Sequence, residues 1–177
     1  PPLPKGTAVP DMPPHLSVLC RKTEQIPAAL DAGANAVYLD FEDLRDYAEG
    51  IKTVREHGKS IPVFLATPRI QKPSEVGYFK LMERAEPDGI LIRNLGAAQY
   101  FRQSPLHRIG DFSLNVANPY SAAILKKRGN LAHLTISYDL NAEQVEDLLR
   151  AAPPEWFELT LHQHMPMFHM EHCVFCT

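Results

Sequence analysis

The stretch "AVYLDFEDLRDYAEGIKTVREHGKSIPVFLA" (36–66) decides the fold, because one helical pattern separates two short apolar runs. The runs "AVYLD" (36–40) and "IPVFLA" (61–66) have the length and composition of buried strands. The residues between them repeat at helical spacing, and their apolar face holds Leu44, Tyr47, Ala48, Ile51 and Val54. A strand, a helix and a strand in this order predict two parallel strands joined by a crossover helix.

The same alternation continues along the chain in both directions. Further strands are predicted at 16–20, 89–93, 112–116, 133–137 and 157–161, and further helices at 24–33, 73–86, 96–103, 119–129 and 142–152. Seven strands and six helices in strict order predict an α/β protein, a TIM-like (β/α) barrel that lacks part of its eighth unit. A doubly wound open sheet is the alternative, but its first turn is normally rich in glycine, and "CRKTEQ" (20–25) has none.

The totals are those of one globular domain. Of the 177 residues, 1–14 form a proline-rich linker or tail, and 15–177 form a single barrel-like domain. A net charge of −3 argues against a nucleic-acid surface built on bulk charge. Three cysteines argue against a disulfide framework, and no apolar run has the length of a membrane span. We therefore expect a cytoplasmic protein that does not bind membranes.

Polar side chains follow most of the predicted strands. In a βα-barrel the active site lies at the carboxyl ends of the strands, so these side chains are expected to share one mouth. The candidate substrate-binding residues are Asp40, Arg69, Arg93 and Tyr138, and the two arginines suit a phosphate or a carboxylate. The candidate catalytic residues are Asn115, Asn118, His162, His164 and Glu171. The alternative is that strand ends are polar only because they meet water.

The segment "HQHMPMFHMEHCVFC" (162–176) concentrates side chains that bind metals. His162 and His164 alternate, so both would face one side of a strand, where they would bind a metal or a substrate. The alternative is a pair of histidines that are hydrogen-bonded within the barrel. Cys173 and Cys176 form a C-x-x-C pair, and His172 is a third candidate ligand. Zinc sites, iron–sulfur clusters and redox pairs all use this spacing. Two cysteines do not complete a four-ligand site, so further ligands must come from elsewhere in this chain or from beyond Thr177.

Several segments resemble one known family. The closing stretch "FELTLHQHMPMFHMEHCVFC" (157–176), "LSVLCRKTEQIPAALDAGANAVYLDFEDL" (16–44) and "GDFSLNVANPYSA" (110–122) resemble peptidase family U32, the collagenase-like peptidases, in its long-form branch with an EHCVFC segment. The resemblance implies a TIM-like barrel and a peptidase label without an established mechanism. It also implies an iron–sulfur cluster completed in a longer protein, with Cys173 matching a motif cysteine and this chain ending inside the motif. The family's preceding cysteine falls at Pro166 here.

Three functions follow as alternatives. The first is a U32 peptidase fragment with its active site at the barrel mouth, although the chain has neither G-x-S-x-G nor H-E-x-x-H. The second is iron–sulfur-dependent hydroxylation of RNA or a small molecule, and the third is a non-catalytic binding module with a structural zinc site. The substrate class stays open between peptide, RNA and small molecule. Because seven strands leave two sheet edges unpaired, the remainder of a parent protein or a second copy of the chain is expected as a partner.

Overall fold

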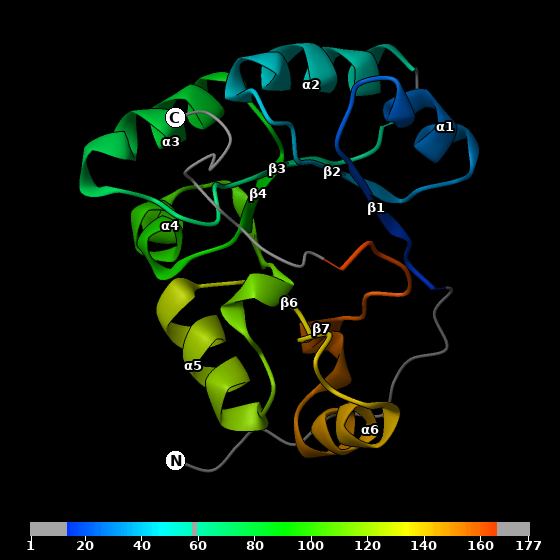
Figure 1. Cartoon of the computed structure of the whole chain (residues 1–177), viewed down its shortest axis with the longest axis vertical. Helices are drawn as coiled ribbons and strands as arrows, with labels where there is room; N and C mark the ends of the chain where they lie inside the picture. Colours follow the sequence, from blue (N-terminus) through cyan, green and yellow to red (C-terminus); the bar gives the residue numbers. More distant parts are fainter. Residues whose placement is uncertain (1–13, 58–59, 166–177) are drawn as a thin grey trace, which may run out of the picture.

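The computed structural model describes residues 14–57 and 60–165. In these ranges one parallel sheet of seven strands hydrogen-bonds in the order of the sequence. The strands are β1 (Ser17–Cys20), β2 (Ala36–Leu39), β3 (Val63–Ala66), β4 (Gly89–Ile92), β5 (His107–Gly110), β6 (His133–Thr135) and β7 (Phe157–Glu158). The sheet curls into an incomplete TIM-like barrel (Figure 1), which confirms the predicted fold class.

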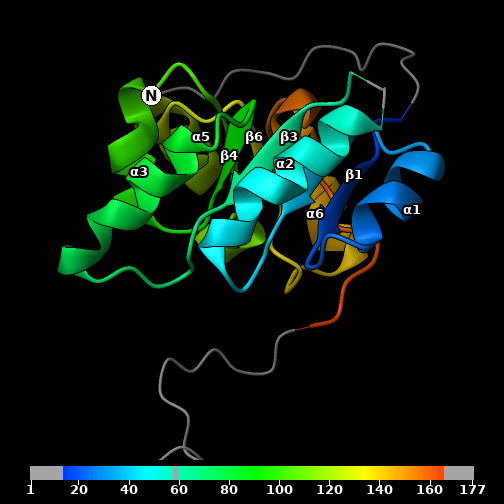
Figure 2. The same ribbon diagram turned by 90° about the horizontal axis from the view of Figure 1, so that it is seen from above.

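In the described ranges the chain has six α-helices, which lie around the curled sheet (Figure 1). They are α1 (Gln25–Asp31), α2 (Tyr47–Glu56), α3 (Val76–Arg84), α4 (Leu95–Tyr100), α5 (Pro119–Gly129) and α6 (Ala142–Ala151). Figure 2 shows α1, α2 and α3 along one flank of the strands. The last three helices begin at a capping asparagine; for example, the side chain of Asn94 accepts a hydrogen bond from Ala97 N, and that of Asn141 accepts one from Gln144 N.

Two layers of apolar side chains hold the barrel together. The larger layer lies between sheet and helices and includes Leu39, Leu65 and Ile90 from the strands. The smaller layer lines the inside of the curl, and its members are Ala36, Tyr38, Phe64, Ala66, Leu91 and Ile109. Because successive side chains of a strand point to opposite faces, the residues two positions after these inward-facing ones also point inward. This alternation brings the polar strand ends together inside the mouth.

The barrel is open between β1 and β7. Among the described residues β1 pairs only with β2 and β7 only with β6. One hydrogen bond crosses the interior near this opening, from the Tyr38 hydroxyl on β2 to Glu158 Oε1 on β7, at 2.6 Å. A side-chain bridge therefore links strands that no backbone ladder joins. Association through the open edges stays a prediction, which light scattering of the chain would test.

The fifth strand lies at a different place from the predicted one. The apolar run 112–116 was expected as a strand, but β5 is His107–Gly110, and Phe112–Leu114 form a 3₁₀ helix. The first half of β5 is partly open to solvent and holds the polar residues His107 and Arg108, so the strand lacks the apolar run by which the other strands were predicted. A Cβ on Gly110 would lie 2.7 Å from the Leu134 side chain, so the absence of a side chain lets β5 and β6 pack closely.

The seventh strand is shorter than predicted. It was expected to run from 157 to 161, but β7 contains only Phe157 and Glu158. It pairs with the end of the three-residue β6, at Leu134 and Thr135, and has no described neighbour on its other side. An edge strand with so short a partner has no further backbone groups to pair with.

No helix in the described ranges is both long and apolar enough to cross a membrane.

Candidate binding site at the strand ends

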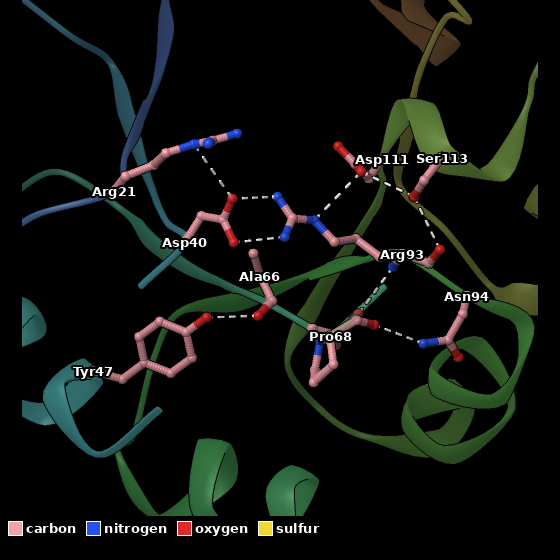
Figure 3. Close-up of polar contacts among 10 residues, drawn as sticks. Arg21, Asp40, Tyr47, Ala66, Pro68, Arg93, Asn94, Asp111 and Ser113 are labelled. Carbon is pink, nitrogen blue, oxygen red and sulfur yellow. Dashed lines mark hydrogen bonds and ion pairs between the residues drawn. The ribbon is translucent and has the colours of Figure 1, made fainter. Parts of the chain in front are cut away.

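Charged side chains of alternating sign form a row at the carboxyl ends of the strands (Figure 3). Arg93, directly after β4, donates from Nη1 and Nη2 to the two carboxylate oxygens of Asp40 after β2, at 2.6 and 2.8 Å. Arg93 Nε lies 3.4 Å from Asp111 Oδ2 after β5, an ion-pair distance without hydrogen-bond alignment. Arg21 Nε, after β1, lies 3.9 Å from Asp40 Oδ2. Four strand ends thus contribute to one charged row.

The row is held in place from behind by hydrogen bonds to the strand ends. Thr67 Oγ1 accepts from Arg93 N at 3.0 Å, and the buried Tyr47 hydroxyl donates to Ala66 O at 2.7 Å. Ser113 Oγ lies 2.9 Å from both Arg93 O and Asp111 Oδ2, so its single proton serves one of these acceptors. These contacts fix the backbone of Arg93 and the carboxylate of Asp111, and the two hydrogen bonds to Asp40 orient the Arg93 guanidinium.

Burial and charge act against each other at Asp40. Burial by itself would raise the pKa of this carboxyl, since a charged group is poorly solvated there. The hydrogen bonds and charge of Arg93 lower it, and the charges of Arg21 and Arg69 add to this effect. The balance holds the pKa of Asp40 below its ordinary value of 3.8. Asp40 is therefore ionised at neutral pH and unsuited to proton transfer there.

Two arginines at the mouth keep guanidinium surface available. The side chain of Arg21 is 60 % exposed, and among the described residues its one carboxylate contact is the long one to Asp40. Arg69 lies over the ring of Phe112, with Cζ 5.1 Å from the centroid, and no carboxylate of the described chain pairs with it. Phe112 in turn packs on Tyr138, with centroids 4.9 Å apart. A guanidinium stacked by its face keeps its N–H edges free for a planar anion.

The structure places the predicted substrate-binding residues on the same edge of the sheet. Asp40 and Arg93 form the central pair, and Arg69 and Tyr138 both contact the ring of Phe112. Arg93 is 6 % exposed and donates from both terminal nitrogens to Asp40, so its burial leaves little guanidinium surface for a ligand. Direct contact with a substrate by any of them stays a prediction.

The two predicted catalytic asparagines have local roles in the backbone. Asn115 is exposed and adopts a left-handed conformation, with φ 53°, at the end of the 3₁₀ helix that follows β5. Asparagine tolerates this conformation better than most residues. Asn118 Oδ1 accepts hydrogen bonds from Tyr120 N and Ser121 N at the start of α5. The left-handed backbone at Asn115 and the cap at Asn118 each explain why an asparagine occurs there, without any contact to a substrate.

Substitution of Asn118 tests its role as the cap of α5. Asn118→Ala is expected to lower the free energy of unfolding by about 1 kcal/mol, because α5 loses its cap. Asn118→Asp keeps the acceptor and is expected to stay close to wild type. Urea denaturation measures both. If Asn118→Ala were as stable as wild type, the cap would not account for this residue.

His162 and His164 lie beyond the end of β7. Both are exposed, and their ring centroids are 6.0 Å apart with the planes at 72°. They therefore approach each other, although not as successive inward positions of a strand. The other predicted residues of this segment, Glu171, His172, Cys173 and Cys176, lie outside the described residues. In the described part of the chain no three His, Cys, Asp or Glu side chains are grouped so as to hold a metal ion.

Three polar residues of the barrel interior did not emerge from the sequence as candidates. Asp111 and Ser113 were not recognised as strand-end residues, because β5 was expected to begin five residues later. The signal that marks the end of this strand is "GD" (110–111), directly after Ile109. Glu158 was hidden inside an apolar run, where its alternation with Phe157 and Leu159 marks the inward face.

Comparison with known proteins identifies the fold. No family model matches the chain, and no curated protein matches its sequence significantly. A mandelate racemase/muconate lactonizing family protein from Azoarcus sp. EbN1 is similar in structure, with a TM-score of 0.61 and 15% identity over 82% of this chain and 42% of that one. A phosphonomutase-like protein from Burkholderia cenocepacia J2315 has a TM-score of 0.55 and 14% identity over 82% and 76%. MenC from Desulfotalea psychrophila LSv54 has a TM-score of 0.51 and 14% identity, over 84% and 46%.

These neighbours correct the family predicted from the sequence. They belong to enolase-superfamily and phosphonomutase-like barrels, so the assignment to peptidase family U32 is wrong. The physical reason is that the segments behind the resemblance are strand–helix units, and every βα unit needs the same buried strand and small-residue helix start. The chain spans less than half the length of the first of these structures. What the similarity shows is the fold: an incomplete TIM-like α/β barrel.

Proposed function

We propose that this chain forms the substrate-binding part of a barrel enzyme that acts on a small anionic molecule, a carboxylate or a phosphate. The observation that carries the proposal is the position of Arg69. It lies at the carboxyl edge of the strands, stacked on Phe112, without a carboxylate partner in the described chain. Charged ligands of βα-barrels bind at this edge. Arg21, on the other side of Asp40, is the second arginine with exposed surface.

The arrangement favours an anion because the central acid is already neutralised. Asp40 accepts hydrogen bonds from both terminal nitrogens of Arg93, so its single charge is shared between Arg93, Arg21 and Arg69. Across the row, three guanidinium groups face the two carboxylates Asp40 and Asp111. An anion placed between Arg21 and Arg69 would form charge-assisted hydrogen bonds with both guanidinium groups, and such bonds are stronger than those between neutral groups.

Titration with two simple anions tests the proposal. Pentanoate and inorganic phosphate are added separately to labelled protein, and amide and guanidinium NMR shifts are followed. We expect the shifts to concentrate at the strand ends, and Arg69→Gln to weaken binding of the preferred anion by about tenfold or more. The arm that binds more tightly identifies the carboxylate or the phosphate class.

Arg84→Gln is the matched control. Arg84 is an exposed arginine in the last turn of α3, which leads into the amino-terminal end of β4, the edge of the sheet opposite the carboxyl ends, and its loss removes the same charge from the protein. Binding by Arg84→Gln should equal binding by wild type. Equal weakening in both variants would assign the effect to net charge, and no localised shift with either anion would refute the proposal.

The metal-dependent alternatives rest on residues outside the described ranges. An iron–sulfur cluster or a zinc site would use Cys173, Cys176 and His172. Both stay predictions, which metal analysis of the protein purified without oxygen would test. The anion site proposed above uses described residues alone.

A further inference from the structure

Glu158 is the carboxylate of the barrel interior that has no cationic partner in the described chain. Asp40 is paired with Arg93 and approached by Arg21, and Asp111 lies 3.4 Å from Arg93 Nε. The side-chain contact recorded for Glu158 is the hydroxyl of Tyr38, which donates to Oε1 at 2.6 Å. Among the described residues, no donor contacts its second oxygen, Oε2. The carboxylate is half-buried and its one protein donor is neutral, so Oε2 is available to a cationic ligand.

Tyr38 positions this carboxylate below the charged row. The ring of Tyr38 is 6 % exposed and lies edge-on to Phe64, with centroids 5.3 Å apart, so its hydroxyl has a defined direction. Burial, and then the charge of Glu158, raise the pKa of Tyr38 far above its ordinary value, so the hydroxyl stays a donor at neutral pH. The carboxylate of Asp111 adds to this effect. Glu158 accepts a hydrogen bond from Tyr38, a side chain of the inner layer, so it lies on the inside of the curl, as the mouth residues do.

The separation between the row and Glu158 follows from the strand geometry. Tyr38 and Asp40 are two positions apart along β2 and point to the same side of the sheet, so their levels differ by roughly 6–7 Å. The mouth level has the guanidinium groups of Arg21, which is 60 % exposed, and of Arg69, and the deeper level has the carboxylate of Glu158, which pairs with no cation of the described chain. The interior is thus positive at its entrance and negative below it.

We propose that the ligand is a small amino acid-like zwitterion, whose anionic group binds Arg21 and Arg69 and whose protonated amine binds Glu158 Oε2. This inference rests on the proposed function and deepens it, because it adds a second charged group to the anionic molecule. An ammonium group supplies both the charge and the hydrogen bond that Glu158 lacks, and a neutral ligand supplies at most the hydrogen bond. Glu158 contacts the ligand directly, and Tyr38 is a positioning residue.

Three matched probes test the charge pattern. They are 5-aminopentanoate, which carries both groups at a suitable spacing, pentanoate, which lacks the amine, and pentylamine, which lacks the anion. Calorimetry or NMR titration of the folded protein gives the affinities. We expect wild type to bind 5-aminopentanoate about tenfold more tightly than pentanoate, and pentylamine more weakly than either.

Two variants assign the preference to Glu158. Glu158→Gln keeps an acceptor for Tyr38 and removes the charge, so it should bind 5-aminopentanoate and pentanoate equally. Arg69→Gln should weaken both probes by the same factor and keep their ratio. Circular dichroism confirms that each variant is folded. Tyr38→Phe should reduce the preference for 5-aminopentanoate over pentanoate, because Glu158 loses the donor that positions it, although Tyr38 itself does not contact the ligand.

The outcomes separate this inference from the proposed function. If pentanoate binds wild type at the strand ends but 5-aminopentanoate binds no better, Glu158 is only a strut between β2 and β7, and the zwitterion is refuted. A preference that survives in Glu158→Gln refutes it as well. If neither pentanoate nor phosphate binds, the proposed anion site falls, and the zwitterion falls with it.

Discussion

Asp40→Asn is expected to lower the free energy of unfolding by about 3 kcal/mol, because it leaves the buried Arg93 guanidinium without its anion. Arg93 is 6 % exposed, so water cannot replace the two hydrogen bonds that Asp40 accepts. Asp111 stays 3.4 Å from Nε and offsets a small part of the loss. Urea denaturation monitored by circular dichroism measures the change. A loss below about 1 kcal/mol, the range of surface ion pairs, would show that Arg93 reaches solvent.

The same variant gives a defined pH dependence. The pKa of Asp40 is lowered in the folded protein, so its contribution to stability is complete above the unfolded pKa of about 3.9 and is lost as pH falls through the folded pKa. Wild type and Asp40→Asn should therefore differ most near neutral pH and converge below about pH 4. A difference that grows on acidification would contradict the sign of this shift.

Two further variants separate burial from pairing. Asp43 also accepts hydrogen bonds from an arginine, Arg45, through both carboxylate oxygens, but this pair is exposed. The pKa of Asp43, about 2, reflects hydrogen bonds that are made in water. Asp43→Asn should therefore change stability far less than Asp40→Asn. Adding Arg93→Met to Asp40→Asn removes the uncompensated charge, so the double variant should recover part of the lost stability.

Gly89→Ala is expected to cost about 2–3 kcal/mol, because the first residue of β4 has no room for a methyl group. A Cβ there would lie 2.6 Å from His107 O of the neighbouring strand and closer still to the Phe64 ring. Phe64 is one of the inward-facing residues, and a backbone carbonyl in a sheet cannot turn away. The substitution therefore has to move β5 or Phe64. Thermal and urea denaturation would measure the loss.

Gly77→Ala is the matched control for this prediction. Gly77 is exposed in the first turn of α3, and a Cβ there would meet nothing within 4 Å. Alanine reduces the freedom of the unfolded chain, so this variant should gain about 0.5 kcal/mol. Opposite signs for the two substitutions would support close packing at Gly89. A loss at both positions would point to a general cost of removing glycine.

The sequence by itself determined the order and period of the elements. Tyr47, Ile51 and Val54 recur at helical spacing and are buried in α2, and "VFLA" forms β3 as expected. These signals are local, because a helix or a strand buries one face and the period of apolar residues records which face. For the same reason the pair Asn141 and Gln144 predicts the capping box at the start of α6, which the structure contains, whereas the cap that Asn94 provides to α4 was not predicted. The barrel class follows from this order.

Only the tertiary structure decided which polar groups meet. Arg93 binds Asp40 across 53 positions of the chain, and Tyr38 binds Glu158 across 120. The sequence predicted that Asp40 and Arg93 lie at strand ends, but their pairing depends on the inward direction of each side chain and on how far each strand extends. One shifted strand, β5, was enough to hide Asp111. Pairing of distant side chains is set by the curl and register of the whole sheet, and no local periodicity records it.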